Sequence, residues 1–427
     1  MKAISNVSAL QIFQILRYAT LTLISVVFAK SHLSKIEIGE YETLIFIASA
    51  ASFFWLTGII KSFLANNKNT KEKSSDIFNF YILIISFTIL SFATVKFITS
   101  DTVNWLSVNF ADKLAIYILL LGTASISEYI LLFLNKNKML ITYGVIAYAT
   151  QFVVIVYPVI NGGGIETIIN SLILIVVIKN IFTLYLVFRY SKISFSFKFI
   201  KTNIRVAFPL ILSFLLSGSA QYIDGFIIKY RFDEKVFAVF RYGAKEFPLL
   251  ILLSDAMSTA FVNNFNNENR ETILQSLKEK SNKLIKRLFP LSIFLLISST
   301  YLFEVIFSKE FVESAVIFDV YLLLIVSRLV FPQTVAMGLK DSSIILKASV
   351  LELIINVTLS LVFVIYFGIV GVAFATVIAF YIEKLYIVIS VNSRFGISSS
   401  KYINFKPLIL YSVILFAAFI IKYLYII

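Results

Sequence analysis

The sequence predicts an all-α polytopic membrane protein, and three observations lead to that fold class. Hydrophobic residues make up 59% of the 427 residues and charged residues only 15%, whereas soluble domains carry about 25% charged residues. The mean hydropathy is +0.90. Apolar stretches follow one another, each long enough for a helix to cross about 30 Å of hydrocarbon. They are too long and too uniform to alternate like barrel strands, so helices are the expected spanning elements.

Thirteen apolar segments predict thirteen spans joined by short connections. They cover residues 7–29, 37–60, 77–95, 113–135, 140–160, 167–189, 205–229, 237–262, 286–306, 314–338, 346–367, 371–392 and 405–427. The connection 266–287 carries apolar residues near helical spacing among charges. This pattern predicts an amphipathic helix that lies on the membrane surface and runs into the ninth span.

Lysine and arginine predict the orientation of these spans. The N-terminus and alternate connections hold 23 of these residues, and the opposite set of connections holds 8. Because basic residues concentrate on the cytoplasmic side, we expect a cytoplasmic N-terminus. An odd number of spans then places the C-terminus outside.

Composition also excludes several classes of function. The chain has no cysteine, which excludes disulfides, thiolate metal sites and cysteine nucleophiles. A single histidine, His32, excludes imidazole metal clusters and His-dependent catalytic triads. We therefore expect no catalytic residue, no cofactor and no metal site. The net charge of +14 is attributed to topology and to anionic lipid headgroups, and nucleic acid is not an expected partner.

A weak internal repeat predicts two lobes. An offset of 199 residues aligns Lys30 with Lys229, and an offset of 205 aligns Arg189 with Arg394. Spans 1–6 thus resemble spans 7–12, and an even number of spans per half makes the repeats parallel. We expect an N-terminal lobe at 1–200, a C-terminal lobe at 201–395 and an additional C-terminal helix at 396–427. Chance similarity among apolar helices is the alternative.

Charged residues inside the predicted spans are the informative ones, because each costs about 2.5–3.5 kcal/mol to insert. In the eighth span, Arg241, Lys245 and Asp255 have spacings that place them on one face of a continuous helix. Pro248 is expected to bend that helix. A polar stripe must face protein or water, so it predicts either internal ion pairs or a water-filled cavity.

Seven intramembrane residues form the predicted substrate-binding set. Five are cations and two are acids that temper their charge: Arg17, Lys179, Arg241, Lys245, Arg328, Asp224 and Glu128. Buried cations need anions, and arginine binds phosphate oxygens through paired hydrogen bonds. We expect these residues to line a cavity between the lobes; for any one of them, a structural ion pair is the alternative. Five further charges also lie within spans: Asp319, Glu352, Glu383, Lys384 and Glu246.

The order of several short segments resembles a known family. These segments are 38–41 (IGEY), 201–210 (KTNIRVAFPL), 217–219 (SGS), 222–224 (YID) and 368–373 (GIVGVA). With the cytoplasmic start, they resemble the Wzx-type polysaccharide-repeat (O-antigen or capsule) flippases of the MATE-like multidrug, oligosaccharidyl-lipid and polysaccharide (MOP) exporter superfamily. The likeness covers essentially the whole chain, although its motifs are diffuse.

The resemblance implies a fold, a function and partners. The fold would be a MATE-like two-lobe bundle of six plus six transmembrane helices with about one extra C-terminal helix. The function would be translocation of undecaprenyl-pyrophosphate-linked oligosaccharide repeat units by alternating access, for surface polysaccharide synthesis. Partners would be that lipid-linked substrate, membrane lipids, H⁺ or Na⁺ as a coupling ion, and the polysaccharide polymerase machinery. The location would be the bacterial cytoplasmic (inner) membrane.

Two alternatives belong to other classes of function. A cation-coupled drug antiporter of the same superfamily is expected to carry an acid in its first span, where this chain has Arg17 and no acid. A membrane enzyme such as a polysaccharide polymerase is expected to need a substantial outer loop, and the outer connections here are short.

Overall fold

The structure is a computed structural model that describes residues 6–65, 73–100, 109–245, 248–265 and 269–425. Within these ranges every regular element is a helix and none is a strand. Ten helices are long and apolar enough to cross a membrane, and a bent pair at Ser314–Arg328 and Pro332–Gly338 makes up to eleven among the described residues. The predicted all-α, polytopic fold class is confirmed.

The chain divides into two compact units, which are described separately. Unit 1 comprises Met1–Gly218 and Phe232–Ala238, and unit 2 comprises Ser219–Arg231 and Val239–Ile427. The lobes expected from the sequence, at 1–200 and 201–395 with an additional helix at 396–427, stay predictions.

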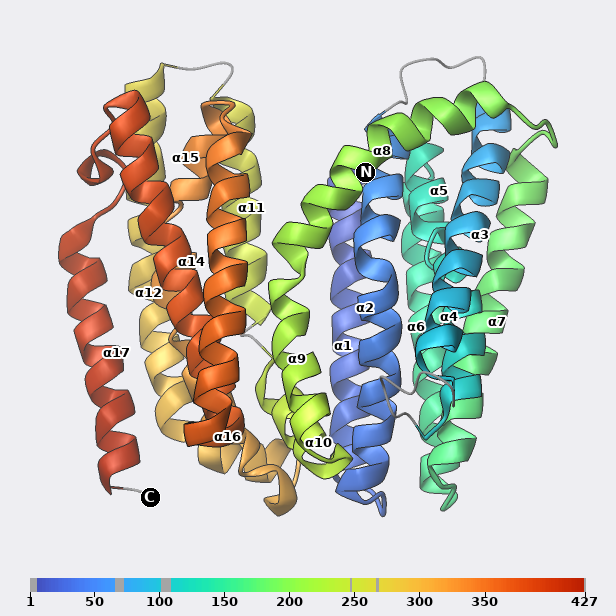
Figure 1. Ribbon diagram of the computed structural model, residues 1–427, viewed down its shortest axis with the longest axis horizontal. Coiled ribbons are helices and arrows are strands. Elements are labelled where there is room, and N and C mark those ends of the chain that lie inside the picture. Colours follow the sequence, from blue (N-terminus) through green and yellow to red (C-terminus); the bar gives the residue numbers. More distant parts are fainter. Residues whose placement is uncertain (1–5, 66–72, 101–108, 246–247, 266–268, 426–427) are drawn as a thin grey trace. The chain divides into compact units, whose positions relative to one another are not determined.

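Unit 1 is a bundle of long helices (Figure 1). They are α1 (Asn6–Ala29), α2 (Lys35–Ala65), α3 (Lys73–Ile98), α4 (Ala111–Ala124), α5 (Ser127–Phe133), α6 (Asn137–Ile160), α7 (Ile165–Tyr190) and α8 (Phe197–Gly218). Small residues let their backbones approach closely. A Cβ at Gly58 of α2 would lie 2.6 Å from Ile211 Cγ1 of α8. Aromatic stacking fills the core, where the Phe63 ring lies 4.0 Å from that of Phe80 and 4.4 Å from that of Phe133.

Unit 2 contains shorter and broken helices as well as two very long ones. They are α9 (Ala220–Arg231), α11 (Pro248–Asn264), α12 (Arg270–Ile306), α13 (Ser314–Leu322), α14 (Ile325–Arg328), α15 (Pro332–Gly338), α16 (Ser342–Phe395) and α17 (Phe405–Tyr425). Two short 3-10 turns lie at Lys309–Phe311 and Ser399–Lys401. Helix α10 (Glu234–Gly243) begins in the segment assigned to unit 1 and ends in unit 2.

Helix α16 reverses direction at Gly368. This residue adopts φ 57° and ψ −142°, a conformation that essentially only glycine tolerates. Asn356 Nδ2 donates a hydrogen bond to Thr376 Oγ1 across 3.2 Å, although 20 residues separate the two. In a straight helix they would lie about 30 Å apart. The two arms of α16 therefore fold back on each other, and they correspond to the eleventh and twelfth predicted spans.

The continuous eighth span predicted at 237–262 is wrong. Helix α10 ends at Gly243 and α11 begins at Pro248, so Arg241 and Asp255 do not share one helix. Proline suits the first position of a helix, where its missing N–H costs nothing. Ala244 and Lys245 lie outside helices, so the helix breaks before Pro248, and the bend predicted within one continuous helix is wrong.

The amphipathic helix predicted at 266–287 exists, but its surroundings differ from the prediction. It is the first part of α12, whose 37 residues extend about 55 Å and continue into the ninth span. Its apolar residues Ile273, Leu274 and Leu277 are buried in the protein. Ser281 Oγ donates to the Leu329 carbonyl across 2.7 Å. The apolar face thus packs on protein and is not available to a membrane surface.

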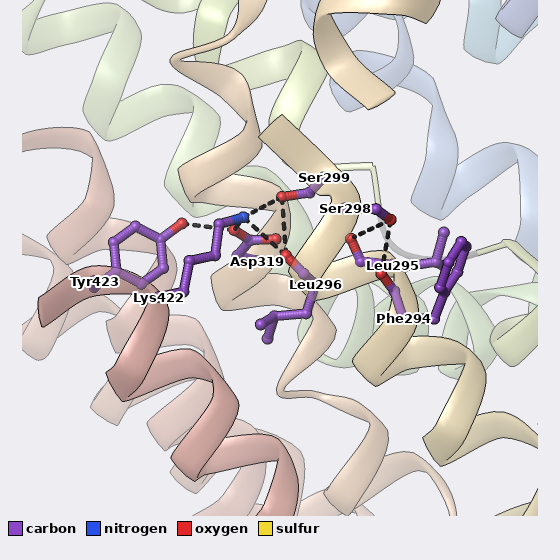
Figure 2. Close-up of polar contacts among 8 residues, drawn as sticks. All are labelled: Phe294, Leu295, Leu296, Ser298, Ser299, Asp319, Lys422 and Tyr423. Carbon is purple, nitrogen blue, oxygen red and sulfur yellow. Dashed lines mark hydrogen bonds and ion pairs between the residues drawn. The ribbon is translucent and has the colours of Figure 1, made fainter. Parts of the chain in front are cut away.

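A buried ion pair attaches α17 to the rest of unit 2. Lys422 Nζ donates to Asp319 Oδ2 of α13 across 2.6 Å, to Ser299 Oγ across 2.6 Å and to the Leu296 carbonyl across 2.8 Å. Tyr423 also donates to Asp319 Oδ2, across 2.6 Å. Figure 2 shows both α17 side chains converging on Asp319. All three ammonium protons have acceptors, as burial of such a charge requires.

Candidate functional site

Unit 1 holds a charge cluster made by three of its helices. Arg17 comes from α1, Glu128 from α5 and Lys179 from α7. Glu128 is 4% exposed and interacts electrostatically with both cations. Lys179 Nζ donates to Gln151 Oε1 across 2.7 Å and lies 4.8 Å from the centroid of the Tyr148 ring. Two cations therefore face one carboxylate, which leaves the cluster with a cationic excess.

Lys179 also lines a cavity of about 310 Å³ between α6 and α7. Its wall is otherwise uncharged and mostly apolar: Met139, Thr142, Tyr143, Ile146, Ala147, Thr150, Ile175, Ile178 and Phe182. The Tyr143 and Phe182 rings stack at 4.3 Å. In such surroundings an ammonium group attracts an anion more strongly than it does in water.

Unit 2 holds a buried carboxylate, Asp224 of α9, that is 3% exposed. Its Oδ2 accepts hydrogen bonds from the Tyr321 hydroxyl across 2.8 Å and from the Thr376 hydroxyl. Asn356 donates to Thr376, and Ser360 Oγ donates to Asn356 Oδ1 across 3.1 Å. Asp224 Oδ1 is buried and has no hydrogen-bond partner among the residues that the structure describes. The turn at Gly368 brings the two arms of α16 to this carboxylate.

A second polar site in unit 2 surrounds Arg328. A cavity of about 60 Å³, room for a few water molecules, is lined by Ser254, Asp255, Ser258, Ser327, Arg328, Phe331, Pro332, Gln333, Thr334 and Lys384. Lys384 Nζ lies 2.9 Å from Glu383 Oε2, and Gln333 Nε2 donates to Glu383 Oε1 across 2.5 Å. The Arg328 guanidinium lies 4.8 Å from the centroid of the Phe380 ring.

Backbone strain borders this polar cavity. Phe331 adopts the left-handed conformation, φ 57°, between α14 and α15. A bulky residue rarely does so, and such strain concentrates at ligand sites and at moving segments. Pro332 follows at the first position of α15. Side chains from both sides of this break, in α14 and α15, therefore line the cavity.

The structure brings together some of the predicted site residues. Arg17, Glu128 and Lys179 meet in unit 1 as one cluster. Asp224 and Arg328 belong to two separate polar sites of unit 2. Of the other predicted substrate-binding residues, Lys245 lies in the chain between α10 and α11, and its Nζ is 4.7 Å from the centroid of the Tyr242 ring. Arg241 lies in the last turn of α10 and is partly exposed.

Sequence reasoning missed the uncharged members of these sites. Tyr321, Asn356 and Thr376 surround Asp224, and Gln151 holds Lys179. Asn356 carried the clearest signal, because a buried amide within an apolar span needs partners. Lys422 was also missed, although it is a cation inside the last apolar segment.

Comparison with known proteins now assigns the family. A family model described as "Polysaccharide biosynthesis protein" matches residues 32–316. The chain belongs to this polysaccharide biosynthesis family. No curated protein matches the chain.

Solved structures show which fold this family member has. "Lipid II flippase MurJ, inward closed conformation" is similar with a TM-score of 0.69 at 20% identity, covering 96% of this chain and 92% of that one. An outward-facing multidrug resistance MATE transporter of the MOP superfamily has a TM-score of 0.55 at 15% identity, covering 93% and 98%. The "MATE transporter ClbM in complex with Rb⁺" has 0.55 at 12%, covering 95% of each chain. The fold is therefore that of the MOP superfamily, as the sequence predicted.

Proposed function

We propose that this polysaccharide biosynthesis protein is a flippase for undecaprenyl-pyrophosphate-linked oligosaccharide repeat units. It moves them to the outer leaflet for O-antigen or capsule synthesis and catalyses no chemical reaction. The observation that carries the proposal is the cationic excess of the unit 1 cluster, where Arg17 and Lys179 face the single carboxylate of Glu128. Family membership and the MOP fold support the same function.

The physical task explains why intramembrane cations are needed. A pyrophosphate carries charge that costs tens of kcal/mol to bury in hydrocarbon, and each unpaired sugar hydroxyl adds to that cost. Arginine and lysine side chains replace the water that the phosphates lose. Arg17, Lys179, Arg241, Lys245 and Arg328 remain our proposed headgroup ligands, with Glu128 and Asp224 limiting the local charge.

A deletion strain tests this function and separates it from its rivals. If the chain is a flippase, deletion removes surface polysaccharide and leaves lipid-linked repeat units on the inner leaflet, and a plasmid copy restores the surface polymer. Single repeat units at the surface would instead indicate a polymerase. Normal polysaccharide with altered drug susceptibility, in a strain without a redundant flippase, would indicate a drug antiporter.

We further propose that a monovalent cation, Na⁺ or H⁺, couples transport at Asp224. A buried carboxylate with one oxygen bonded by two hydroxyls and the other unpartnered within the described residues suits a small hard cation. The residues that would hold Na⁺ are Asp224, Asn356 and Thr376, which come from α9 and from both arms of α16.

Thermal unfolding of the purified protein distinguishes the two ions. Na⁺ at about 100 times its Kd stabilises a protein by about 2.7 kcal/mol, so NaCl should raise the Tm relative to choline chloride of equal ionic strength. Asp224→Asn should remove that difference. If Na⁺ does not change the Tm, and a pH gradient drives transport by the wild type but not by Asp224→Asn, the coupling ion is H⁺. Sodium stabilisation that persists in Asp224→Asn would exclude this site.

A further inference from the structure

A short non-helical segment before α8, residues 191–196, is held in place by one buried amide. Asn79 of α3 is fully buried. Its Nδ2 donates to the Ser194 carbonyl across 2.8 Å, and its Oδ1 accepts from the Ser196 N–H across 2.8 Å. A second proton on Nδ2 goes to the Ser75 carbonyl, also across 2.8 Å. With all of these bonds made, the amide fixes the backbone of residues 194–196.

Three large apolar side chains in and beside this segment are exposed. Ile193, Phe195 and Phe197 have exposed fractions of 72%, 64% and 69%. All three lie within five residues of the chain, next to the backbone groups that Asn79 binds. Exposed clusters of this kind mark sites of contact with a membrane or a partner.

The first turns of α8 have one buried face and one exposed face. Asn203 and Ala207 are buried, and Ser62 Oγ of α2 donates to the Asn203 carbonyl across 3.1 Å. On the other face, Lys198 and Lys201 are exposed. Figure 1 shows this first part of α8 running across the ends of the neighbouring helices of its unit before the helix turns to follow their direction.

The charged residues of this exposed surface are all cationic. Lys192, Lys198, Lys201 and Arg205 lie in a stretch, 167–223, that contains no aspartate or glutamate. Within the described part of the chain, none of the four forms an ion pair. Their charge is therefore available to an external anion.

We propose that residues 191–208 form an interfacial binding site for anionic phospholipids. Ile193, Phe195 and Phe197 insert below the headgroups, and the cations contact the phosphates. Exposed aromatic and aliphatic residues beside exposed basic residues are typical of segments that lie in the membrane interface. Each Lys or Arg near an anionic leaflet increases the binding constant for that leaflet by about fivefold. This site is independent of the substrate that the protein carries.

Fluorescence quenching by brominated lipids tests the site in the full-length protein. A Phe197→Trp variant is placed in nanodiscs of equimolar phosphatidylglycerol and phosphatidylcholine, with bromine on one lipid or the other. The signal of the native Trp55 and Trp105 is subtracted with the parent protein. We expect brominated phosphatidylglycerol to quench the introduced indole about twofold more strongly, and 0.5 M salt (about a 4 Å Debye length) to reduce that preference.

Removing three positive charges from α8 or from α12 shows which segment selects the anionic lipid. In the Phe197→Trp background, K198Q/K201Q/R205Q should bring the quenching ratio close to one. K283Q/K286Q/R287Q removes the same charge from exposed positions of α12 and should leave the ratio unchanged. Lys198→Arg with Lys201→Arg should also retain it, which separates loss of charge from loss of folding.

Three results would overturn the proposal. Equal quenching by the two lipids would show that no anionic lipid is selected. A preference that survives K198Q/K201Q/R205Q would place the selection elsewhere. Quenching of the introduced indole by aqueous acrylamide but not by brominated lipid would show that this face meets water or another protein.

Discussion

Single polar residues inside the apolar helices are placed where partners stabilise them. Lys179 has an amide acceptor, an aromatic face and a nearby carboxylate, supplied by Gln151, Tyr148 and Glu128. Arg17 interacts with the same carboxylate, but its side chain is exposed on the surface of unit 1. An exposed intramembrane cation is costly unless it meets water or an anion. The two cations of one cluster therefore have different surroundings, and Lys179 is the better-defined target for substitution.

Lys179→Ala should reduce complementation of a flippase-deficient strain at least about tenfold. A charge-assisted hydrogen bond contributes about 1.5–3 kcal/mol, and the substitution would remove the ammonium group that we propose binds phosphate. Lys179→Arg should retain part of the activity because the charge is kept. Surface polysaccharide, normalised to protein level on a blot, is the measurement.

Lys138→Ala provides the matched control, since Lys138 is an exposed cation at the start of α6. It should support full complementation. A Lys179→Ala protein that is normally expressed and fully active would exclude Lys179 as a headgroup ligand. Loss of protein from the membrane would instead point to the structural role, because removing one member of a buried charge cluster destabilises a fold.

For single residues, the sequence predicted which charged side chains lie within the spans, but not which of them lie together in the folded protein. Arg17, Glu128 and Lys179 stood out because charge within an apolar span is expensive. That they form one cluster depends on α1, α5 and α7 packing together, which is tertiary information. Asn356 and Thr376 lie 20 residues apart and meet only because the chain reverses at Gly368.

At the scale of elements, hydropathy located the apolar segments better than it located helix ends. A window average counts side chains one at a time and is blind to backbone breaks. The left-handed Phe331 divides the predicted span 314–338, and the non-helical residues Ala244 and Lys245 divide 237–262. Phe331 could not have been foreseen, because only surrounding contacts hold a bulky residue in that conformation.

Helix α17 should depend on its buried ion pair. Removing one member of a buried pair costs about 3–5 kcal/mol, because the other charge is left without a partner. Lys422 is 5% exposed and Asp319 is 0% exposed, so solvent cannot replace the lost partner. Lys422→Met should therefore lower the Tm of the purified protein by about 3–6 °C, measured by thermal unfolding in detergent.

The double variant Asp319→Leu with Lys422→Met separates pairing from packing. Apolar replacement of both members is often neutral or stabilising, so the double variant should recover most of the lost Tm. Lys309→Met, at an exposed ion pair with Glu304, should change the Tm little. Equal Tm values for the wild type and Lys422→Met would show that α17 is held by apolar packing alone.

At the scale of the whole molecule, chain order and compact units do not coincide. Helix α8 packs within unit 1, and α9, which follows it, begins unit 2. The seventh apolar segment, 205–229, thus contributes residues to both units. Sequence repeats compare the order of spans, whereas compactness depends on which side chains touch, so neither predicts the other.

Unit 2 supplies an argument for the topology of the C-terminus. Helix α17 starts beside the beginning of α12, where Lys401 Nζ lies 3.3 Å from Glu271 Oε1 and Lys278 Nζ donates to the Ser400 carbonyl across 2.7 Å. Near its end, Lys422 bonds to Leu296 and Ser299, far along α12. Between Glu271 and Leu296, α12 advances about 38 Å, more than the roughly 30 Å of hydrocarbon. Helix α17 therefore runs alongside α12 for the full depth of a membrane.

The basic first half of α12 then decides which side each end faces. Arg270, Lys278, Lys280, Lys283, Lys286 and Arg287 lie there, and basic residues favour the cytoplasm. A cytosol-active reporter fused at residue 2 should be active, and a reporter that requires export should be active when fused after residue 427. Inactivity of the exported reporter after residue 427, with the cytosolic one active there, would place both ends in the cytoplasm. Because α17 spans as much of the bilayer as α12 does, that result would require α17 to leave α12 and would contradict the Lys422 contacts.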